Sequence, residues 1–283
     1  NKEQFAELTR QVPTFATDVM SIMSARLRRY MDDEVQRLRL QEELAIGQKI
    51  QLSLLPDSCP IIPGWSLVAS YHAARQVGGD LYDFIHDPHN PDLLHLVIAD
   101  VTGKGVPAAM FMAVCRTIIR TEAQNGRSPA ELLRRTNQQL IHEKRSLPFL
   151  TAFYGSLNLK TGNLVYALGG HDRPYWLQAD GTLTQLTGLG MLLGAFPVVR
   201  LDEREIRLAP GDSLILYTDG ITEARNGVEL FDDSRLEDLI ASCTAASASQ
   251  IKHNILTAVH EFTGDHPQSD DMTLVVLQRD PER

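Results

Sequence analysis

Cysteine is scarce in this 283-residue sequence, which contains three: Cys59, Cys115 and Cys243. They lie far apart and form no C-x-x-C pair, so the sequence predicts neither a disulfide framework nor a cysteine zinc site. Cys115 and Cys243 have apolar or small neighbours, which favours a place in the core over a role as nucleophile. A reducing compartment is the simplest expectation.

Long apolar runs and an export signal are also missing. No segment reaches the roughly 18 consecutive apolar residues that a membrane-spanning helix needs. The first ten residues are polar and show no basic region followed by an apolar one. We therefore expect no membrane association and a cytoplasmic location.

Basic residues are outnumbered, because 27 Lys and Arg stand against 36 Asp and Glu, a formal net charge of -9. This balance argues against a protein that mainly neutralises a nucleic-acid backbone or an anionic membrane. The excess carboxylates point instead toward cations. With 43% hydrophobic and 22% charged residues, the composition is that of a folded soluble protein.

Residues 1–55 are expected to form a helical linker or stalk. Glycine is absent before Gly47, the one proline is Pro13, and apolar residues recur at spacings of three, four and seven. These positions are Met20, Met23, Leu27, Met31, Val35, Leu38 and Ala45. Because Glu34 and Gln41 interrupt the seam, two interpretations stay open: a helix packed on its own domain, or a parallel dimer stalk that carries a signal.

The front of this segment resembles the closing helices of a cyclic-nucleotide-binding sensor domain. The similar positions are Phe5, Leu8, Pro13, Phe15, Met20 and residues 26–28. The resemblance implies that this segment is the tail of an upstream sensor. The sequence contains nothing of the nucleotide-binding barrel, so we expect no cyclic nucleotide to bind here.

Residues 56–283 are expected to form a second domain. Short runs rich in β-branched or aromatic residues predict strands at residues 65–71, 81–85, 93–101, 150–157, 164–168, 204–208, 213–217 and 272–277. Helices are predicted at residues 107–124, 128–142, 233–242 and 249–262. Because strands cluster instead of alternating with helices, we expect a layered α+β fold and no doubly wound parallel sheet.

Aspartates mark the places where the apolar strands meet turns. The segments are VGGDLYDF with Asp80 and Asp83, VIADVTGKG with Asp100, LILYTDGITEA with Asp219, and SDDMTLVV with Asp270 and Asp271. A single Asp-Gly at a strand end is ordinarily just a turn. Four such segments can bring carboxylates to one cleft, and clustered oxygen ligands without His or Cys suit Mg²⁺ or Mn²⁺ better than Zn²⁺. A bound cation would also offset the repulsion among them.

In order along the chain, these segments resemble the signature of the PPM metal-dependent protein serine/threonine phosphatases, within them the SpoIIE/RsbU-like branch. The similar motifs are Gly78-Gly79-Asp80, Asp100-Val101-Thr102-Gly103-Lys104-Gly105, Tyr217-Thr218-Asp219-Gly220 and Asp270-Asp271-Met272-Thr273. The resemblance covers residues 46–278, including the entry segment 50–56. It implies a two-sheet β-sandwich flanked by helices, with two Mn²⁺ or Mg²⁺ ions bound between the sheets.

Carried over by position, the resemblance implies a set of metal ligands. They are Asp80, Asp100, the backbone carbonyl of Val101, Asp219 and Asp270, with Asp271 as the alternative to Asp270. It further implies that a metal-activated water attacks phosphoserine or phosphothreonine on a regulatory protein of the anti-sigma-factor-antagonist type, under control of the N-terminal helix. Lys104 and Arg75 are the nearest basic candidates for phosphate contact, with ordinary surface charges as the simpler interpretation.

One segment departs from the family. Where the family commonly has Asn-Ala-Gly-His-x-Pro-Pro, this sequence reads LGGHDRP at residues 168–174. Leu168 removes a polar side chain, which bears on substrate preference more than on metal binding. His171 is expected to be a loop or core histidine and not a catalytic acid.

Two other functions are considered. A diguanylate cyclase shares the Gly-Gly-Asp motif, but Leu81 stands where that signature needs an acid, and Asp219 and Asp270 would have no role. The Gly-Lys-Gly at residues 103–105 lacks the spacing of a P-loop. A phosphatase-like fold kept as a signalling scaffold is the non-enzymatic alternative, and the retention of all four aspartates favours activity over it.

Overall fold

The computed structural model describes residue 7 and residues 10–142 and 148–281. The chain divides into two compact units, Asn1–Lys49 and Ile50–Arg283. Within the described ranges, no helix is both long and apolar enough to span a membrane. The second unit holds the sheets and all the aspartates singled out above.

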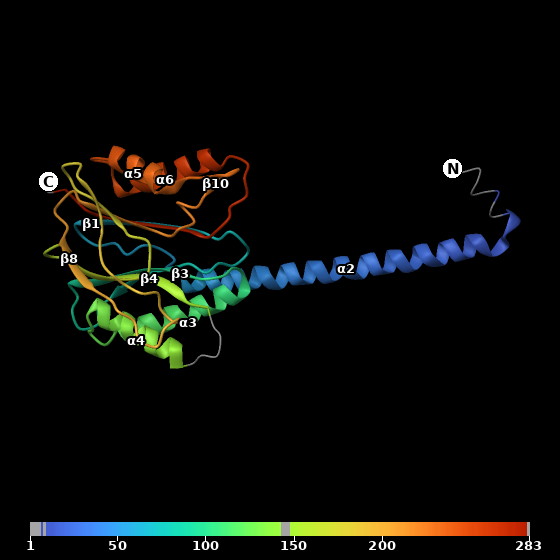
Figure 1. Cartoon of the computed structure of the whole chain (residues 1–283), viewed down its shortest axis with the longest axis horizontal. Coiled ribbons are helices and arrows are strands. Elements are labelled where there is room, and N and C mark those ends of the chain that lie inside the picture. Colours follow the sequence, from blue (N-terminus) through green and yellow to red (C-terminus); the bar gives the residue numbers. More distant parts are fainter. Residues whose placement is uncertain (1–6, 8–9, 143–147, 282–283) are drawn as a thin grey trace. The chain divides into compact units, whose positions relative to one another are not determined.

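One helix, α2 (Pro13–Leu54), forms most of the first unit, and its last residues belong to the second (Figure 1). The predicted helix is confirmed from Pro13 onward. Its apolar stripe is exposed at Met20, Met23, Leu27, Met31, Val35 and Leu38. Phe5 and Leu8, which carried part of the sensor-domain resemblance, lie outside the described residues.

Two five-stranded antiparallel sheets form the body of the second unit. One contains, in order, β1 (Trp65–His72), β12 (Met272–Arg279), β9 (Ser213–Tyr217), β6 (Tyr175–Leu177) and β7 (Leu183–Gln185). The other contains β2 (Leu81–His86), β3 (Leu93–Val101), β4 (Leu150–Asn158), β5 (Asn163–Gly169) and β8 (Glu203–Arg207). A separate hairpin joins β10 (Arg225–Asn226) to β11 (Glu229–Leu230).

Helices cover the outer faces of both sheets. Helices α3 (Val106–Ala123) and α4 (Pro129–His142) pack on the sheet of β2 to β5, and α5 (Asp232–Ser242) and α6 (Ala248–Thr263) pack on the other (Figure 1). Because each sheet is covered by helices on one face and by the other sheet on the other, its central strands are apolar on both faces. In β3, for example, residues 94–99 are all buried.

The predicted α+β sandwich flanked by helices is confirmed. Eight strands and four helices of the second unit are present where the sequence predicts them, with ends shifted by at most two residues. The strands without a predicted counterpart are β6, β7, β10 and β11, which have two or three residues each. Such short strands carry too few residues to show an alternation.

The strand registers bring the aspartate motifs to one end of the sandwich. Antiparallel pairing sets Leu81 of β2 opposite Ala99 of β3, so the segment before β2 lies beside the end of β3. In the other sheet, Tyr217 of β9 pairs with Leu274 of β12, so the segment after β9 lies beside the segment before β12. Asp80 and Asp100 therefore come from one sheet, and Asp219 and Asp270 from the other.

Candidate metal centre

Asp80 is the most deeply buried of these acids. The residue is 1% exposed, and its carboxyl accepts hydrogen bonds from the hydroxyls of Thr218 (2.7 Å) and Thr273 (2.6 Å), both on Oδ2. Burial raises the pKa of Asp80 well above its usual value, and the charge of Asp100 raises it further. The two hydroxyls come from the opposite sheet, so they fix the carboxyl across the gap between the sheets.

The pKa values of Asp100 and Asp219 are also raised, which indicates that both carboxylates belong to one cluster of interacting charges. Burial and then the negative charge of Asp219 raise the pKa of Asp100 to about 7. Burial and then the charge of Asp270 raise the pKa of Asp219 to about 6. The four aspartates therefore act on one another although long stretches of chain separate their motifs.

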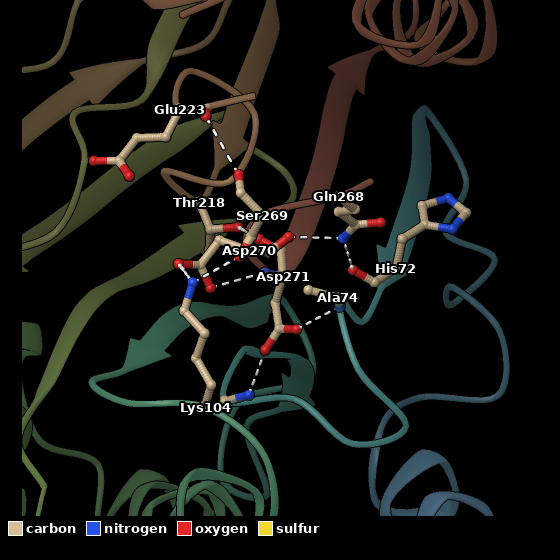
Figure 2. A network of polar contacts seen from close by, with 10 residues as sticks. His72, Ala74, Lys104, Thr218, Glu223, Gln268, Ser269, Asp270 and Asp271 are labelled. Atoms are coloured by element: carbon tan, nitrogen blue, oxygen red, sulfur yellow. Dashed lines mark hydrogen bonds and ion pairs between the residues drawn. The ribbon is translucent and has the colours of Figure 1, made fainter. Parts of the chain in front are cut away.

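Asp270 is engaged by a lysine. Lys104 Nζ lies 2.7 Å from Asp270 Oδ2 and donates a hydrogen bond to the Ser269 carbonyl at 2.6 Å, as Figure 2 shows. Lys104 belongs to the loop after β3, so this ion pair also bridges the two sheets. The ammonium supplies a positive charge beside the acids.

Asp271 has a different role, because its two carboxylate oxygens accept hydrogen bonds from backbone N–H groups. Oδ1 accepts from the Ala74 N–H at 2.7 Å (Figure 2), and Oδ2 accepts from the Gly79 N–H at 2.5 Å. Asp271 therefore shapes the segment that leads into Asp80. This arrangement favours Asp270 over Asp271 as the available ligand.

Close backbone approaches explain two of the glycines. A Cβ on Gly79 would lie 2.7 Å from the Val101 carbonyl oxygen, closer than real contacts allow. At Gly220 a Cβ would collide with the Asp271 backbone carbonyl. Within each sheet, glycine at these positions lets two neighbouring segments approach each other closely next to the acids.

The remaining positions named from the sequence lie around the cluster. The exposed Arg75 has its guanidinium close to Gly105, since a Cβ there would lie 3.8 Å from Nη1. His171 is buried, with Nδ1 2.9 Å from the Thr151 hydroxyl, and burial lowers its pKa to about 4, which does not suit a general acid. Leu168 is buried in the hydrophobic core.

Several side chains around the cluster were not identified from the sequence. Thr218 and Thr273 stand next to or near the expected ligands in the motifs, but nothing in the pattern showed that both donate hydrogen bonds to Asp80. Asp172 also belongs to the acidic surroundings, since burial and the charge of Asp219 raise its pKa to about 6. Asp83 instead points to α3, where Arg120 Nε lies 2.6 Å and Arg116 Nε 3.2 Å from its carboxylate.

The donor set fits a hard divalent cation in its chemistry. Buried carboxylates with raised pKa values gain from a positive charge placed among them, and oxygen ligands suit Mg²⁺ or Mn²⁺. In the described ranges, no three acidic, histidine or cysteine side chains already converge with coordinating geometry. Metal binding therefore requires some side chains to move. The first contact expected to open is the ion pair between Lys104 and Asp270.

Comparison with known proteins identifies the family. The family described as Stage II sporulation protein E (SpoIIE) matches residues 90–280, well over half of the chain. The chain belongs to the SpoIIE family. This membership confirms the resemblance stated from the motifs, and it rejects the diguanylate cyclase alternative.

Similar proteins include a curated phosphatase and solved structures with the same fold. The SpoIIE-family chain is 29% identical over 241 residues to the phosphoserine phosphatase RsbU of Bacillus subtilis, covering 85% of this chain and 71% of RsbU. The RsbU and RsbW domains of Rv1364c from Mycobacterium tuberculosis match with 30% identity and a TM-score of 0.69, covering 81% of this chain and 64% of that one. The SiaA-PP2C domain of Pseudomonas aeruginosa matches with a TM-score of 0.76 and 22% identity, covering 86% and 98%. The second unit is thus a SpoIIE-type phosphatase domain with the PP2C fold, a protein serine/threonine phosphatase by class.

The acidic cluster predicts an unusual pH dependence of stability. Asp100 and Asp219 have pKa values of about 7 and about 6, above their ordinary 3.8, so the folded protein keeps protons that the unfolded chain releases. Their contribution is complete below the unfolded pKa and is lost as pH rises through the folded pKa. We expect the melting temperature of the metal-free protein to decrease by a few degrees from about pH 4.5 to about pH 7.5, and Mn²⁺ to restore it at the higher pH.

Scanning fluorimetry with and without Mn²⁺ checks this expectation. Asp219→Asn removes one ionisable group and should reduce both the decrease with pH and the gain from Mn²⁺. Asp238→Asn, at an exposed position of α5, is the matched control and should behave as wild type. A melting temperature that rises across this range without metal, together with no response to Mn²⁺, would contradict the prediction.

Proposed function

We propose that the chain hydrolyses phosphoserine or phosphothreonine on a regulatory protein in a reaction that depends on two Mn²⁺ or Mg²⁺ ions. The observation that carries the proposal is that Asp80, Asp100, Asp219 and Asp270 come from both sheets into one cluster of interacting charges, in which Asp80 is buried and the other three are half-buried. A cluster with this charge needs a counter-charge, and phosphoryl transfer is chemistry that such metal pairs perform.

The proposed ligands are the four aspartates and the backbone carbonyl of Val101. When bound, two divalent ions lower the pKa of water and offset negative charge on phosphoryl oxygens. Thr218 and Thr273 keep the Asp80 carboxyl oriented through their hydroxyls. Glycine at position 79 leaves room for the Val101 carbonyl oxygen, which a Cβ there would approach to 2.7 Å.

Arg75 and Lys104 are the proposed phosphate contacts. Arg75 is exposed, and its guanidinium lies beside Gly105 in the loop that follows Asp100. Lys104 is bonded to Asp270, and a cation bound by that carboxylate would compete with the ammonium and free it for a phosphoryl oxygen. Both side chains can contact a phosphate on an exposed loop of a substrate, because each is at least partly open to solvent.

The proposed substrate is a small cytoplasmic regulator of the anti-sigma-factor-antagonist type. Support comes from the relatives, since RsbU is named a phosphoserine phosphatase and Rv1364c joins RsbU and RsbW domains. The chain's net charge of -9 is unsuited to a nucleic-acid substrate. A protein substrate of this kind places the enzyme in the cytoplasm.

A catalytically weak scaffold is the second candidate. The observation that favours it is the Lys104–Asp270 ion pair, because an ammonium already supplies part of the counter-charge that a metal would provide. Activity with added metal separates the two functions.

We expect Mn²⁺-dependent release of phosphate from a phosphoserine protein that a chelator abolishes. Asp100→Ala or Asp219→Ala removes one of the carboxylates that would hold the metal pair, so turnover should fall by about 10²-fold or more. Phosphate release from a phosphorylated anti-sigma-factor antagonist measures the effect, with Asp238→Ala as a control that keeps full activity. Unchanged activity in chelator, or in both ligand variants, excludes the metal mechanism, and preference for phosphotyrosine excludes the substrate class.

The exposed stripe on α2 supports a further part of the proposal, in which residues 1–55 form a stalk that dimerises and regulates residues 56–283. Apolar side chains at Met20, Leu27, Met31 and Leu38 are each more than half exposed. Burying such a stripe against a second copy removes apolar surface from water at about 25 cal/mol per Å². In a monomer these side chains stay in water, and this stabilising contribution is absent.

Charged residues at Leu27, Met31 and Leu38 are therefore expected to convert a dimer into a monomer and to change the phosphatase rate while the second unit stays folded. Sedimentation velocity and the phosphate-release assay measure both effects. Glutamate at Ile22 and Leu40, which are exposed on α2 outside the stripe, is the matched control and should leave the dimer intact. A monomeric wild type, or a variant with unchanged mass and rate, shows that the stalk does not act through dimerisation.

A further inference from the structure

Gln51 makes an unusual pair of hydrogen bonds at the end of α2, within the second unit. Its Nε2 donates to the Gly78 carbonyl at 2.5 Å, and its Oε1 accepts from the Gly78 N–H at 3.0 Å. The side chain is 5% exposed. One amide therefore satisfies both backbone groups of a single buried residue, as a neighbouring strand would do.

Gly78 is also enclosed on its other side. A Cβ at this position would collide with the Asp271 carboxylate and the Tyr71 hydroxyl, so only glycine fits. The next residue, Gly79, donates its N–H to Asp271 Oδ2. Residues 78–79 are thus held between Gln51 and Asp271, and Asp80 follows directly.

We propose that Gln51 is a positioning residue for the metal centre: its amide fixes Gly78 and thereby sets where the Asp80 carboxyl stands relative to Asp100. The backbone from Gly78 to Asp80 contains two glycines, which restrict it little by themselves. External hydrogen bonds must then supply the order. The inference rests on the proposed function only in taking Asp80 as a ligand.

Glutamine is suited to this position by both its groups and its length. The site needs one donor and one acceptor on the same side chain, which an amide provides and a carboxylate or thioether does not. Asparagine has both groups but is one methylene shorter. Without the amide, a buried N–H and a buried carbonyl of Gly78 would lose their partners, and the segment would shift to recover them.

Gln51→Met tests the proposal, because methionine has a similar length and apolar stem but no amide. Titration calorimetry measures Mn²⁺ affinity, and fluorimetry measures the melting temperature of the metal-free protein. Loss of a residue that orients a ligand typically weakens metal binding by about 10- to 100-fold. We expect a loss of that size, with kcat largely recovered at saturating Mn²⁺. Gln36→Met, at an exposed position of the same helix, is the control and should bind as wild type.

Gln51→Glu provides a second variant if Gln51→Met does not fold. Glutamate keeps an acceptor for the Gly78 N–H but cannot donate to the Gly78 carbonyl while ionised, so Mn²⁺ affinity should still fall. Wild-type Mn²⁺ affinity in a folded Gln51 variant, with or without a lower melting temperature, overturns the positioning role and leaves the proposed function standing. A wild-type protein that binds no Mn²⁺ overturns both.

Discussion

Desolvation of a group of neighbouring carboxylates, together with their mutual repulsion, is the constraint on which the acidic end of this protein depends. Asp80, Asp100 and Asp219 have pKa values above their usual range because they are withdrawn from water and close to one another's charge. Such a cluster costs folding free energy unless something offsets it. Within the protein, the two threonine hydroxyls on Asp80 and the ammonium of Lys104 offset part of this cost. A bound divalent cation would offset the rest.

The sandwich brings the cluster together, and specific backbone contacts refine it. Asp80 and Asp100 come from one sheet, and Asp219 and Asp270 from the other, so the site exists only when both sheets are packed. Asp271 then ties the segment before Asp80 to the start of β12. Neighbouring residues in the sequence therefore make different contacts: Asp270 pairs with Lys104, whereas Asp271 accepts from the backbone of Ala74 and Gly79.

Much of this arrangement was predictable from the sequence, for identifiable reasons. Long apolar strands such as β3 are buried on both faces and leave a clear run, and the aspartates stand at the ends of such strands, where a shared site could be expected. The preference for Asp270 over Asp271 came from the family resemblance alone, because adjacent identical residues differ only in where the folded backbone points them. The contact of Gln51 could not be predicted either, since one glutamine in a polar helix gives no sign that its amide forms hydrogen bonds with Gly78.

Whether the aspartate cluster is a two-metal centre can be decided by an anomalous diffraction map from crystals grown with Mn²⁺. We expect two peaks bounded by Asp80, Asp100, Asp219, Asp270 and the Val101 carbonyl, with Lys104 no longer paired with Asp270. We also expect that Asp271 still accepts from Ala74 and Gly79. A map without peaks at this end of the sandwich, or with Asp271 as ligand and Asp270 still bonded to Lys104, would contradict this expectation.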